Sequence, residues 1–478
     1  MNAFKKTLLS LTLALSTLSL ANVTAPPVDT TRPLPTLGSM NQLGELSFSV
    51  PTMIRFHTRD GVPVIFTPIK GLPMVDVSLS FQAGSAYDTQ IRADGFGLAN
   101  MTATLITKGT ARLSEDEFLE KSESLGVQLS ASASRDAWSL NLRSLSQKDT
   151  LDPAVALMME ALTTPAFDET VLKRTQTQLI TALTQQEQVP SHVANVAFFQ
   201  TLFNDHPYAH PVTGTKDSVS RLSQAELFAF SKRFLVAQNA VITLTGDLSE
   251  TDAKLLAEKL ATALPTGEKA PALPTPATPK ATHVHINHPS PQTAILMGNL
   301  STPLLSTKSA LHAQNTFDLA NKVLAGGDFG TRLMDEIRVK KGYTYGIYGN
   351  NQQMSTAGIY AISFATQSEK TADALFDTLA VIKDAQTSGI RQDELDLVRF
   401  ESKNNFPNEF SSNSGIHRLA RYMNFYALPD SYLKDYAKSL DQISLKDANA
   451  ALNHTIMPEN FIIITVGNQA PNLVNIGR

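Results

Sequence analysis

The chain of 478 residues repeats one pattern across its length. Residues 239–246 (Asn-Ala-Val-Ile-Thr-Leu-Thr-Gly) return as residues 460–467 (Asn-Phe-Ile-Ile-Ile-Thr-Val-Gly), which begin 221 residues later. The triplet at 98–100 (Leu-Ala-Asn) recurs at 319–321 with the same offset, and the alternating segment 137–144 matches 358–366 in pattern. A period this long indicates two copies of one domain rather than a solenoid of short repeats.

A proline-rich segment lies between the two copies. Residues 265–282 contain five prolines, a density that neither a helix nor a central strand tolerates. We therefore predict an N-terminal domain at 41–264, a linker at 265–282 and a C-terminal domain at 283–478. An extended segment at 22–40 and a signal peptide at 1–21 precede them.

The first residues have the layout of a secretory signal peptide. Lys5 and Lys6 precede an apolar run from Leu8 to Leu20, and the small residue Ala21 offers a cleavage site. The alternative is an N-terminal membrane anchor, but the run is shorter than the ~20 apolar residues that span a bilayer. We expect a periplasmic protein with no stable membrane insertion after cleavage.

Composition excludes several classes of function. The chain has 40 Lys and Arg residues against 44 Asp and Glu residues, so no positive excess is available to neutralise phosphates, and we expect no nucleic acid partner. It has no cysteine, which rules out disulfides, thiol catalysis and cysteine-ligated metals.

Within each copy the patterns predict a mixture of helices and hairpin-like strands. The first copy alternates as strands at 75–83, 127–133 and 137–144, and has helical periodicity at 96–106, 151–162 and 169–187. Ser114 with Glu117, and Ser223 with Glu226, match the pattern that opens a capped helix, and Ser249 with Asp252 opens another. The fold class expected is α+β, with an antiparallel sheet backed by helices in each half.

The most informative stretch is residues 324–345 in the second copy. It contains a glycine-rich turn (Gly-Gly at 326–327), a predicted helix at 331–340 and a strand expected from Tyr343 to about Tyr348. Arg338 and Tyr345 stand seven positions apart. Spacing alone is also typical of a plain turn-helix-strand unit with a solvated basic end.

This stretch closely resembles the pitrilysin family of metallopeptidases, which includes insulysin and mitochondrial processing peptidase. The second homologous domain of that family carries Gly-Gly-x-x-x-x-Arg-Leu followed by an Arg and a Tyr seven positions apart. The segments 83–88 and 206–215 also resemble family motifs, so the resemblance covers nearly the whole mature chain. It implies two α+β halves arranged as a clamshell around an extended peptide.

Active members of the family bind zinc through His-x-x-Glu-His on a helix of the first half. The matching positions in this chain are Asn100, Ala103 and Thr104, and the position of the distant acidic ligand is Thr181 or Ala182. Asn and Thr are poor zinc ligands and alanine cannot act as a base. We therefore predict that this chain binds no zinc.

Other histidines could hold a metal in principle. His283, His285 and His288 cluster after the linker, with the first two on one face of a predicted strand, and His206 and His210 lie four apart around Pro207. We interpret these as a solvated strand and a structured loop, and we expect no metal and no bound cofactor.

An exported chain with the Arg/Tyr pair but no zinc ligands resembles the partner subunit of two-chain bacterial members. That resemblance implies a heterodimer in which a homologous chain supplies zinc, while Arg338 and Tyr345 contribute to peptide hydrolysis in trans. Peptides or unfolded segments, added to a sheet edge, would be the substrate. The alternative function is an inactive pseudopeptidase that binds peptides or acts as a scaffold. The alternative role of Arg338 and Tyr345 is that they only pack an interface between the halves. Tyr343 is the alternative to Tyr345 for the functional position. An enzyme with an independent active site is not supported, because the sequence has no Gly-x-Ser-x-Gly motif.

Overall fold

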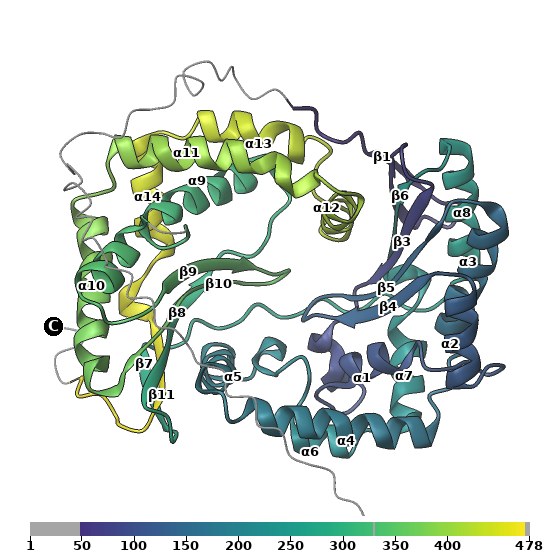
Figure 1. Ribbon diagram of the computed structural model, residues 1–478, viewed down its shortest axis with the longest axis horizontal. Coiled ribbons are helices and arrows are strands. Elements are labelled where there is room, and N and C mark those ends of the chain that lie inside the picture. Colours follow the sequence, from purple (N-terminus) through teal and green to yellow (C-terminus); the bar gives the residue numbers. More distant parts are fainter. Residues whose placement is uncertain (1–47, 328–329, 474–478) are drawn as a thin grey trace, which may run out of the picture. The chain divides into compact units, whose positions relative to one another are not determined.

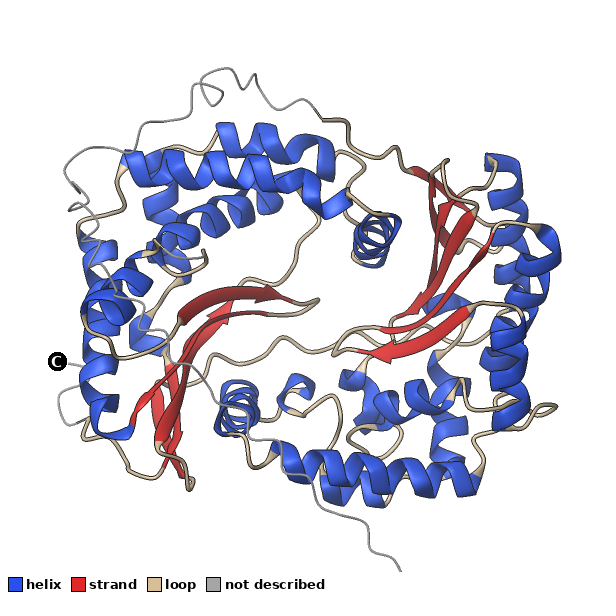
Figure 2. Ribbon diagram, in the orientation of Figure 1, coloured by secondary structure: helices blue, strands red, loops and turns tan. Residues whose placement is uncertain are grey.

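The computed structural model describes residues 48–327 and 330–473 (Figure 1). The predicted signal peptide and the extended segment 22–40 lie outside the described residues. Figure 2 shows two separate groups of strands, each accompanied by helices.

The first half of the chain forms a six-stranded sheet with the order β1-β2-β6-β3-β5-β4. Its strands are β1 (Ile54–His57), β2 (Pro63–Pro68), β3 (Met74–Phe81), β4 (Gln128–Ala133), β5 (Trp138–Leu145) and β6 (Ala240–Gly246). Its helices are α1 (Leu98–Leu105), α2 (Glu115–Ser124), α3 (Lys148–Thr163), α4 (Glu169–Gln186), α5 (Pro190–Phe203), α6 (Lys216–Ser220), α7 (Gln224–Phe234) and α8 (Glu250–Ala263).

The second half forms a five-stranded sheet with the order β7-β11-β8-β10-β9. Its strands are β7 (Thr282–Asn287), β8 (Gln292–Ser301), β9 (Ile347–Gln353), β10 (Gly358–Gln367) and β11 (Ile462–Gly467). Its helices are α9 (Lys308–Leu324), α10 (Thr371–Thr387), α11 (Gln392–Asn405), α12 (Asn413–Phe425), α13 (Tyr432–Asp441) and α14 (Leu445–Thr455).

The two sheets confirm the α+β class and the internal repeat. Apart from β1, the strand orders are the same, and the repeated segments 239–246 and 460–467 become β6 and β11 at equivalent places. Each sheet is antiparallel except for one parallel pair, β2 with β6 and β7 with β11. The pair is parallel because β6 and β11 each return to the sheet after a long helical excursion.

The sequence located most of the elements within a few residues. The capping boxes of Ser114 and Ser223 form, and Ser249 caps α8. The strand expected from Tyr343 is wrong in its start, because β9 begins at Ile347. Thr344 Oγ1 donates to Gly346 O (2.9 Å) and accepts from Gly346 N (3.2 Å), and this local turn delays the entry into the sheet.

The two faces of the first sheet differ in chemistry. One face packs its apolar side chains, such as Val77, Leu79 and Leu140, into a large core with α1, α3, α7 and α8. The other face carries hydroxyl and amide groups from β3, β5 and β6, since alternate residues of a strand point to opposite faces.

Each half also packs one helix on the sheet of the other half. Helix α12 from the second half packs on β6, β2 and β3, while α5 from the first half packs on β11 and β8. Figure 1 shows α12 on the opposite side of the first sheet from α3 and α8. The helices α5 and α12 are separated by about the repeat offset, so the exchange is reciprocal.

These two equivalent interfaces are built differently. Under α5 lies an apolar cluster that includes Phe198, Ile464 and Val466. Under α12, the positions equivalent to Ile464 and Val466 are Thr243 and Thr245, which bond to polar side chains of the helix. The duplicated fold therefore has one apolar and one hydrogen-bonded interface between its halves.

The linker between the halves forms neither helix nor strand from 265 to 281. It is nevertheless tied to the first half. Asn239 Oδ1 accepts from Ala270 N (2.6 Å), Tyr87 Oη donates to Pro271 O (3.2 Å), and the His206 ring bonds Pro274 O (2.8 Å).

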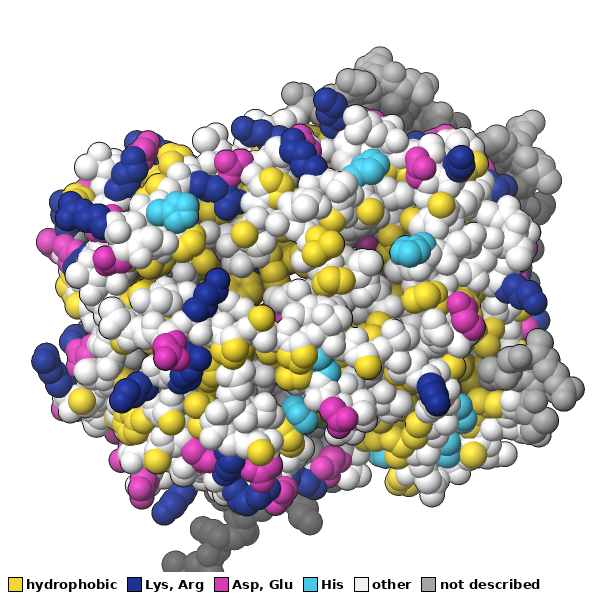
Figure 3. Space-filling view, turned by 180° about the vertical axis from the view of Figure 1, so that it is seen from behind, with side chains coloured by type: hydrophobic (Ala, Val, Ile, Leu, Met, Phe, Trp, Pro, Cys, Tyr) yellow, Lys and Arg dark blue, Asp and Glu magenta, His cyan; other side chains and the backbone are white. Residues whose placement is uncertain are grey.

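Two surface properties bear on partners. In the part of the chain that the structure describes, no helix combines the length and hydropathy needed to cross a bilayer. On the face seen in Figure 3, Lys and Arg side chains lie among Asp and Glu side chains rather than in one patch. The expectation that nucleic acid is not a partner stays a prediction.

Candidate functional site

Helix α1 carries the degenerate zinc positions Asn100, Ala103 and Thr104. Ala103 is buried in the first core, whereas Thr104 is exposed. The Thr104 hydroxyl donates to Asn100 O at 2.9 Å, so it bonds its own helix. On α4, the exposed Thr181 hydroxyl likewise donates to Thr177 O at 2.8 Å. Neither hydroxyl is arranged as a ligand, and the residues present do not fit a zinc ion.

The start of α1 is held by a buried carboxylate. Asp88 is 1% exposed and accepts from Gly97 N and Ala99 N, both at 2.8 Å. Burial raises the pKa of Asp88 to about 8, while the backbone N–H groups of α1 act in the opposite direction. The Trp138 indole adds a hydrogen bond to Ala99 O at 3.2 Å. These contacts hold the start of α1 in place, although Asn100, Ala103 and Thr104 at its motif positions are not zinc ligands.

Residues of the motif at 206–215 pack against the entry to α1. Gly97 and Gly214 have φ angles of +91° and +76°, and their backbones approach closely. A side chain at Gly214 would place its Cβ 2.3 Å from Phe96 O, so only glycine fits there. Ser218 Oγ donates to the same Phe96 carbonyl at 2.8 Å.

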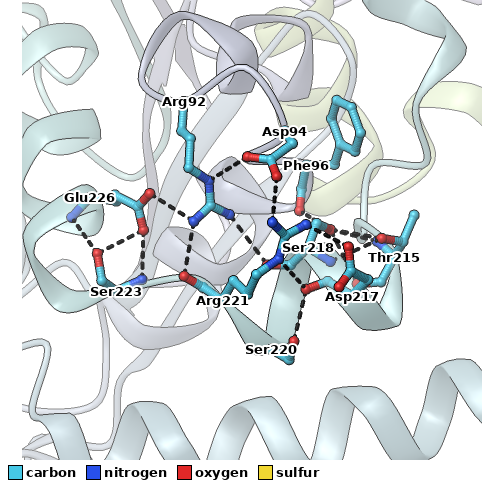
Figure 4. Close-up of polar contacts among 10 residues, drawn as sticks. All are labelled: Arg92, Asp94, Phe96, Thr215, Asp217, Ser218, Ser220, Arg221, Ser223 and Glu226. Atoms are coloured by element: carbon cyan, nitrogen blue, oxygen red, sulfur yellow. Dashed lines mark hydrogen bonds and ion pairs between the residues drawn. The ribbon is translucent and has the colours of Figure 1, made fainter.

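An ion-pair network extends this support (Figure 4). Arg92 pairs with Asp94 at 2.8 Å and with Glu226 at 3.0 Å, and Arg221 pairs with Asp94 at 2.7 Å. Arg92 Nη1 also donates to Arg221 O at 2.9 Å. These contacts connect the loop before α1 to α7 and to the residues that follow α6. These ion pairs and the contacts of Asp88 and Gly214 together position α1.

The histidines singled out as possible metal ligands have other partners. His283 Nε2 and His285 Nδ1, both on β7, bond the Thr465 hydroxyl at 2.9 and 3.0 Å. The His210 ring stacks on Phe96 with centroids 3.7 Å apart. Among the described residues, no three His, Cys, Asp or Glu side chains are grouped as a metal site would require.

Arg338 lies in a π-helical turn (Met334–Lys340) and is half-buried. Within this turn, Lys341 N donates to Glu336 O at 3.1 Å, five residues back. A π turn inserts one residue into a helix and redirects the side chains around it, and such turns are frequent at functional sites. Sequence periodicity predicted an ordinary helix here and gave no sign of the π turn.

Tyr345 follows this turn and is 86% exposed. Its ring and hydroxyl contact none of the described residues through hydrogen bonds or ring stacking. Tyr343, the competing residue, packs partly against the second core, and its hydroxyl bonds Asp377. Burial and Asp377 raise the pKa of Tyr343. Of the two tyrosines, Tyr345 presents its hydroxyl to the outside.

Two family descriptions match the chain. Residues 68–216 match "Insulinase (Peptidase family M16)", and residues 221–401 match "Peptidase M16 inactive domain". A relative from Helicobacter pylori named "Non-peptidase homolog YmxG" is 24% identical over 390 residues, covering 81% of this chain and 88% of the relative. A relative from Rickettsia bellii named "Uncharacterized zinc protease" is 21% identical over 73% of this chain and 81% of its own length.

Solved structures show the same fold. The peptidase M16 inactive domain from Pseudomonas fluorescens is similar with a TM-score of 0.82 and 31% identity, covering 88% of this chain and 99% of that one. A protease from Helicobacter pylori has a TM-score of 0.76 at 19% identity, covering 88% of this chain and all of that one.

Proposed function

Because this chain belongs to the M16 peptidase family and has no zinc ligands at the motif positions of α1, we propose that it is a non-catalytic subunit of a heterodimeric zinc metalloendopeptidase. An M16 member of the non-peptidase kind agrees with the name of the Helicobacter pylori relative, whereas the Rickettsia bellii relative is named a zinc protease. The proposal goes further and places the protein in the periplasm, with a homologous partner that bears His-x-x-Glu-His and zinc.

The observation that carries the proposal is the contrast between the two halves. The zinc positions of the first half are occupied by Asn100, Ala103 and Thr104, while the second half retains Arg338 and an exposed Tyr345. Among the described residues the Tyr345 hydroxyl has no hydrogen-bond partner, which leaves it available to a partner chain. A pure scaffold needs neither residue.

The chemistry allows the two roles to be on different chains. Peptide hydrolysis by zinc requires an activated water, and it also requires donors aimed at the carbonyl oxygen that becomes negative in the tetrahedral intermediate. The Tyr345 hydroxyl would donate to that oxygen, and the Arg338 guanidinium would hold backbone carbonyls of the substrate. The residues of this chain would bind and orient the peptide, and zinc would be supplied by the partner.

Substitution of each tyrosine tests the assignment. In the complex reconstituted with its zinc-bearing partner, Tyr345→Phe should lower kcat for peptide hydrolysis by about 10² to 10³, the usual effect of losing one transition-state donor. Tyr343→Phe is the matched control and should leave kcat close to that of the unmodified complex. Equal losses for the two variants, or a larger one for Tyr343→Phe, would overturn the assignment.

The partner itself can be sought by native mass spectrometry of the tagged protein recovered from its own periplasm. We expect a complex with one chain of similar mass that contains one zinc ion. Recovery as a metal-free monomer or homodimer would contradict the heterodimer and favour a pseudopeptidase that binds peptides or acts as a scaffold.

A further inference from the structure

A cleft lined by serine, arginine and aromatic side chains lies between α12 and the first sheet. It has a volume of about 230 Å³, and six of its lining residues are Ser80, Ser132, Ser139, Arg418, Arg421 and Tyr422. The serines are direct cross-strand neighbours, since Ser139 on β5 pairs with Ser80 on β3 and with Ser132 on β4. The cleft is open because α12 packs on β6, β2 and β3 and leaves the outer strands of the sheet less covered.

Arg421 in this cleft is a half-buried cation without a carboxylate. Its Nη1 donates to Asn141 Oδ1 at 2.8 Å, and Asn141 Oδ1 already accepts from Ser78 Oγ at 2.7 Å. Among the described residues, no Asp or Glu forms an ion pair with Arg421. Burial, together with the nearby Arg418, lowers the pKa of Arg421, which shows that its surroundings disfavour the positive charge.

A guanidinium has five N–H donors, and burying it is costly unless an anion or several acceptors compensate. Arg332 in the second half has both kinds of compensation. It forms an ion pair with Glu394 at 2.7 Å and donates a hydrogen bond to Gly389 O at 2.9 Å. Arg418, one helical turn before Arg421, is exposed and pairs with Glu409 at 3.0 Å. Among the described residues, Asn141 is the one side chain that accepts a hydrogen bond from Arg421, so the other donors of the guanidinium are available to a ligand in the cleft.

The sheet next to the cleft ends in a free edge. Strand β4 is the last strand of the sheet and pairs only with β5 among the described strands. Its sequence, Gln-Leu-Ser-Ala-Ser-Ala, has small side chains, so another extended chain can approach its backbone closely. Ser132 belongs both to this edge and to the lining of the cleft.

We infer that Arg421, with Arg418 and the serine hydroxyls, binds a carboxylate of an extended peptide that lies along β4. This inference rests on the proposed peptide-binding function and adds a substrate preference to it: peptides with an acidic group at one position of the bound strand. The guanidinium would bind the carboxylate in the bidentate manner that arginine favours. The carboxylate can belong to an Asp or Glu side chain or to the peptide's C-terminus.

Calorimetric titration of the mature chain with matched peptides tests the inference. The probes are decapeptides of alternating Thr and Ala, blocked at both ends, in which one residue is Glu or Gln; the substituted position is moved along the peptide. At one position we expect the Glu peptide to bind about tenfold more tightly than its Gln twin, which corresponds to about 1.4 kcal/mol. A twin with a free C-terminus distinguishes a terminal carboxylate from a side chain.

Three variants locate the effect. Arg421→Gln should abolish the preference, so that the Glu and Gln peptides bind this variant with equal affinity, and Arg421→Lys should keep part of the preference because the charge remains. Arg112→Gln, which removes an exposed arginine between α1 and α2, should keep all of it. A preference that survives in Arg421→Gln, or the absence of any preference in the unmodified chain, would overturn the inference.

The peptide-binding experiment and the hydrolysis experiment can fail independently of each other. If the acidic preference depends on Arg421 but Tyr345→Phe has no effect on hydrolysis, the chain binds acidic peptides without contributing to catalysis. If hydrolysis depends on Tyr345 but no peptide shows the preference, the carboxylate site is wrong and the subunit role stands.

Discussion

At the scale of single residues, α1 is held in place although its motif positions carry no zinc ligands. Asp88, Gly97 and Gly214 hold α1 in place through close backbone contacts, although Asn100 and Thr104 bond within the helix. Motif comparison located α1 and its missing ligands. It matched the segment 83–88 but gave its last residue, Asp88, no role, because a carboxyl group nine residues before the cap residue Gly97 has no short-range signal.

We predict that Asp88 stabilises the first half strongly. Asp88→Ala would leave two buried N–H groups of α1 without acceptors, which should lower the free energy of unfolding by about 2 to 4 kcal/mol. Urea unfolding followed by circular dichroism measures the change. Asp116→Ala, an exposed acidic residue in the first turn of α2, is the control and should have a much smaller effect. Similar losses for both would contradict the anchoring role.

At the scale of elements, the main feature is the hydrogen-bonded contact between α12 and the first sheet. His417 bonds Ser78 Oγ at 2.7 Å and Thr245 Oγ1 at 2.9 Å, and Asn424 donates to Ile242 O at 2.8 Å. Periodicity located the strands of this sheet, but its alternating Ser, Asn and Thr residues also fit a solvated face. Only the fold shows that a helix of the other half covers them.

Protonation of His417 should weaken this contact. Burial lowers the pKa of His417 from 6.5 to about 4, with Arg421 and Arg143 acting in the same direction and Asp76 against it. As the pH falls from 6.5 to 4, His417 binds a proton in the unfolded chain but not in the folded chain. The free energy of unfolding should therefore fall by up to about 3 kcal/mol over this range because of His417 alone.

Urea unfolding at pH 7, 5.5 and 4 measures this dependence. His417→Gln keeps a polar side chain but cannot titrate, so it should be less stable at pH 7 and should depend less on pH. The comparison with the unmodified chain removes the contribution of other groups. An identical pH dependence in both proteins would show that His417 is not the titrating group.

At the scale of the whole molecule, one buried carboxylate bonds groups of both halves. Asp136 lies in the turn between β4 and β5 and is 3% exposed. It accepts from the Tyr208 hydroxyl of its own half, and from Ser355 N (2.9 Å) and the Tyr426 hydroxyl (3.1 Å) of the other. Together with the exchange of α5 and α12, this contact makes each half depend on the other for its packing.

Removal of this carboxylate should uncouple the halves. Asp136→Ala would remove the acceptor of the buried Tyr208 hydroxyl, of the half-buried Tyr426 hydroxyl and of Ser355 N, at a cost on the order of 3 kcal/mol. We expect calorimetry to show two thermal transitions where the unmodified chain has one. Asp205→Ala changes an exposed acid near α5 and should leave a single transition. One unshifted transition in Asp136→Ala would show that the apolar contact of α5 suffices to couple the halves.

The sequence by itself determined the duplication, the α+β class and the capped helices, because each depends on residue type at a short or repeated spacing, and its resemblance to a peptidase family implied that the zinc ligands are missing. The tertiary structure alone decided the start of β9, the π turn around Arg338, the exposure of Tyr345 and the cleft of Arg421. These depend on contacts between residues far apart in the chain. Arg421 and Asn141, for example, are 280 positions apart and meet only because α12 packs on the sheet of the other half.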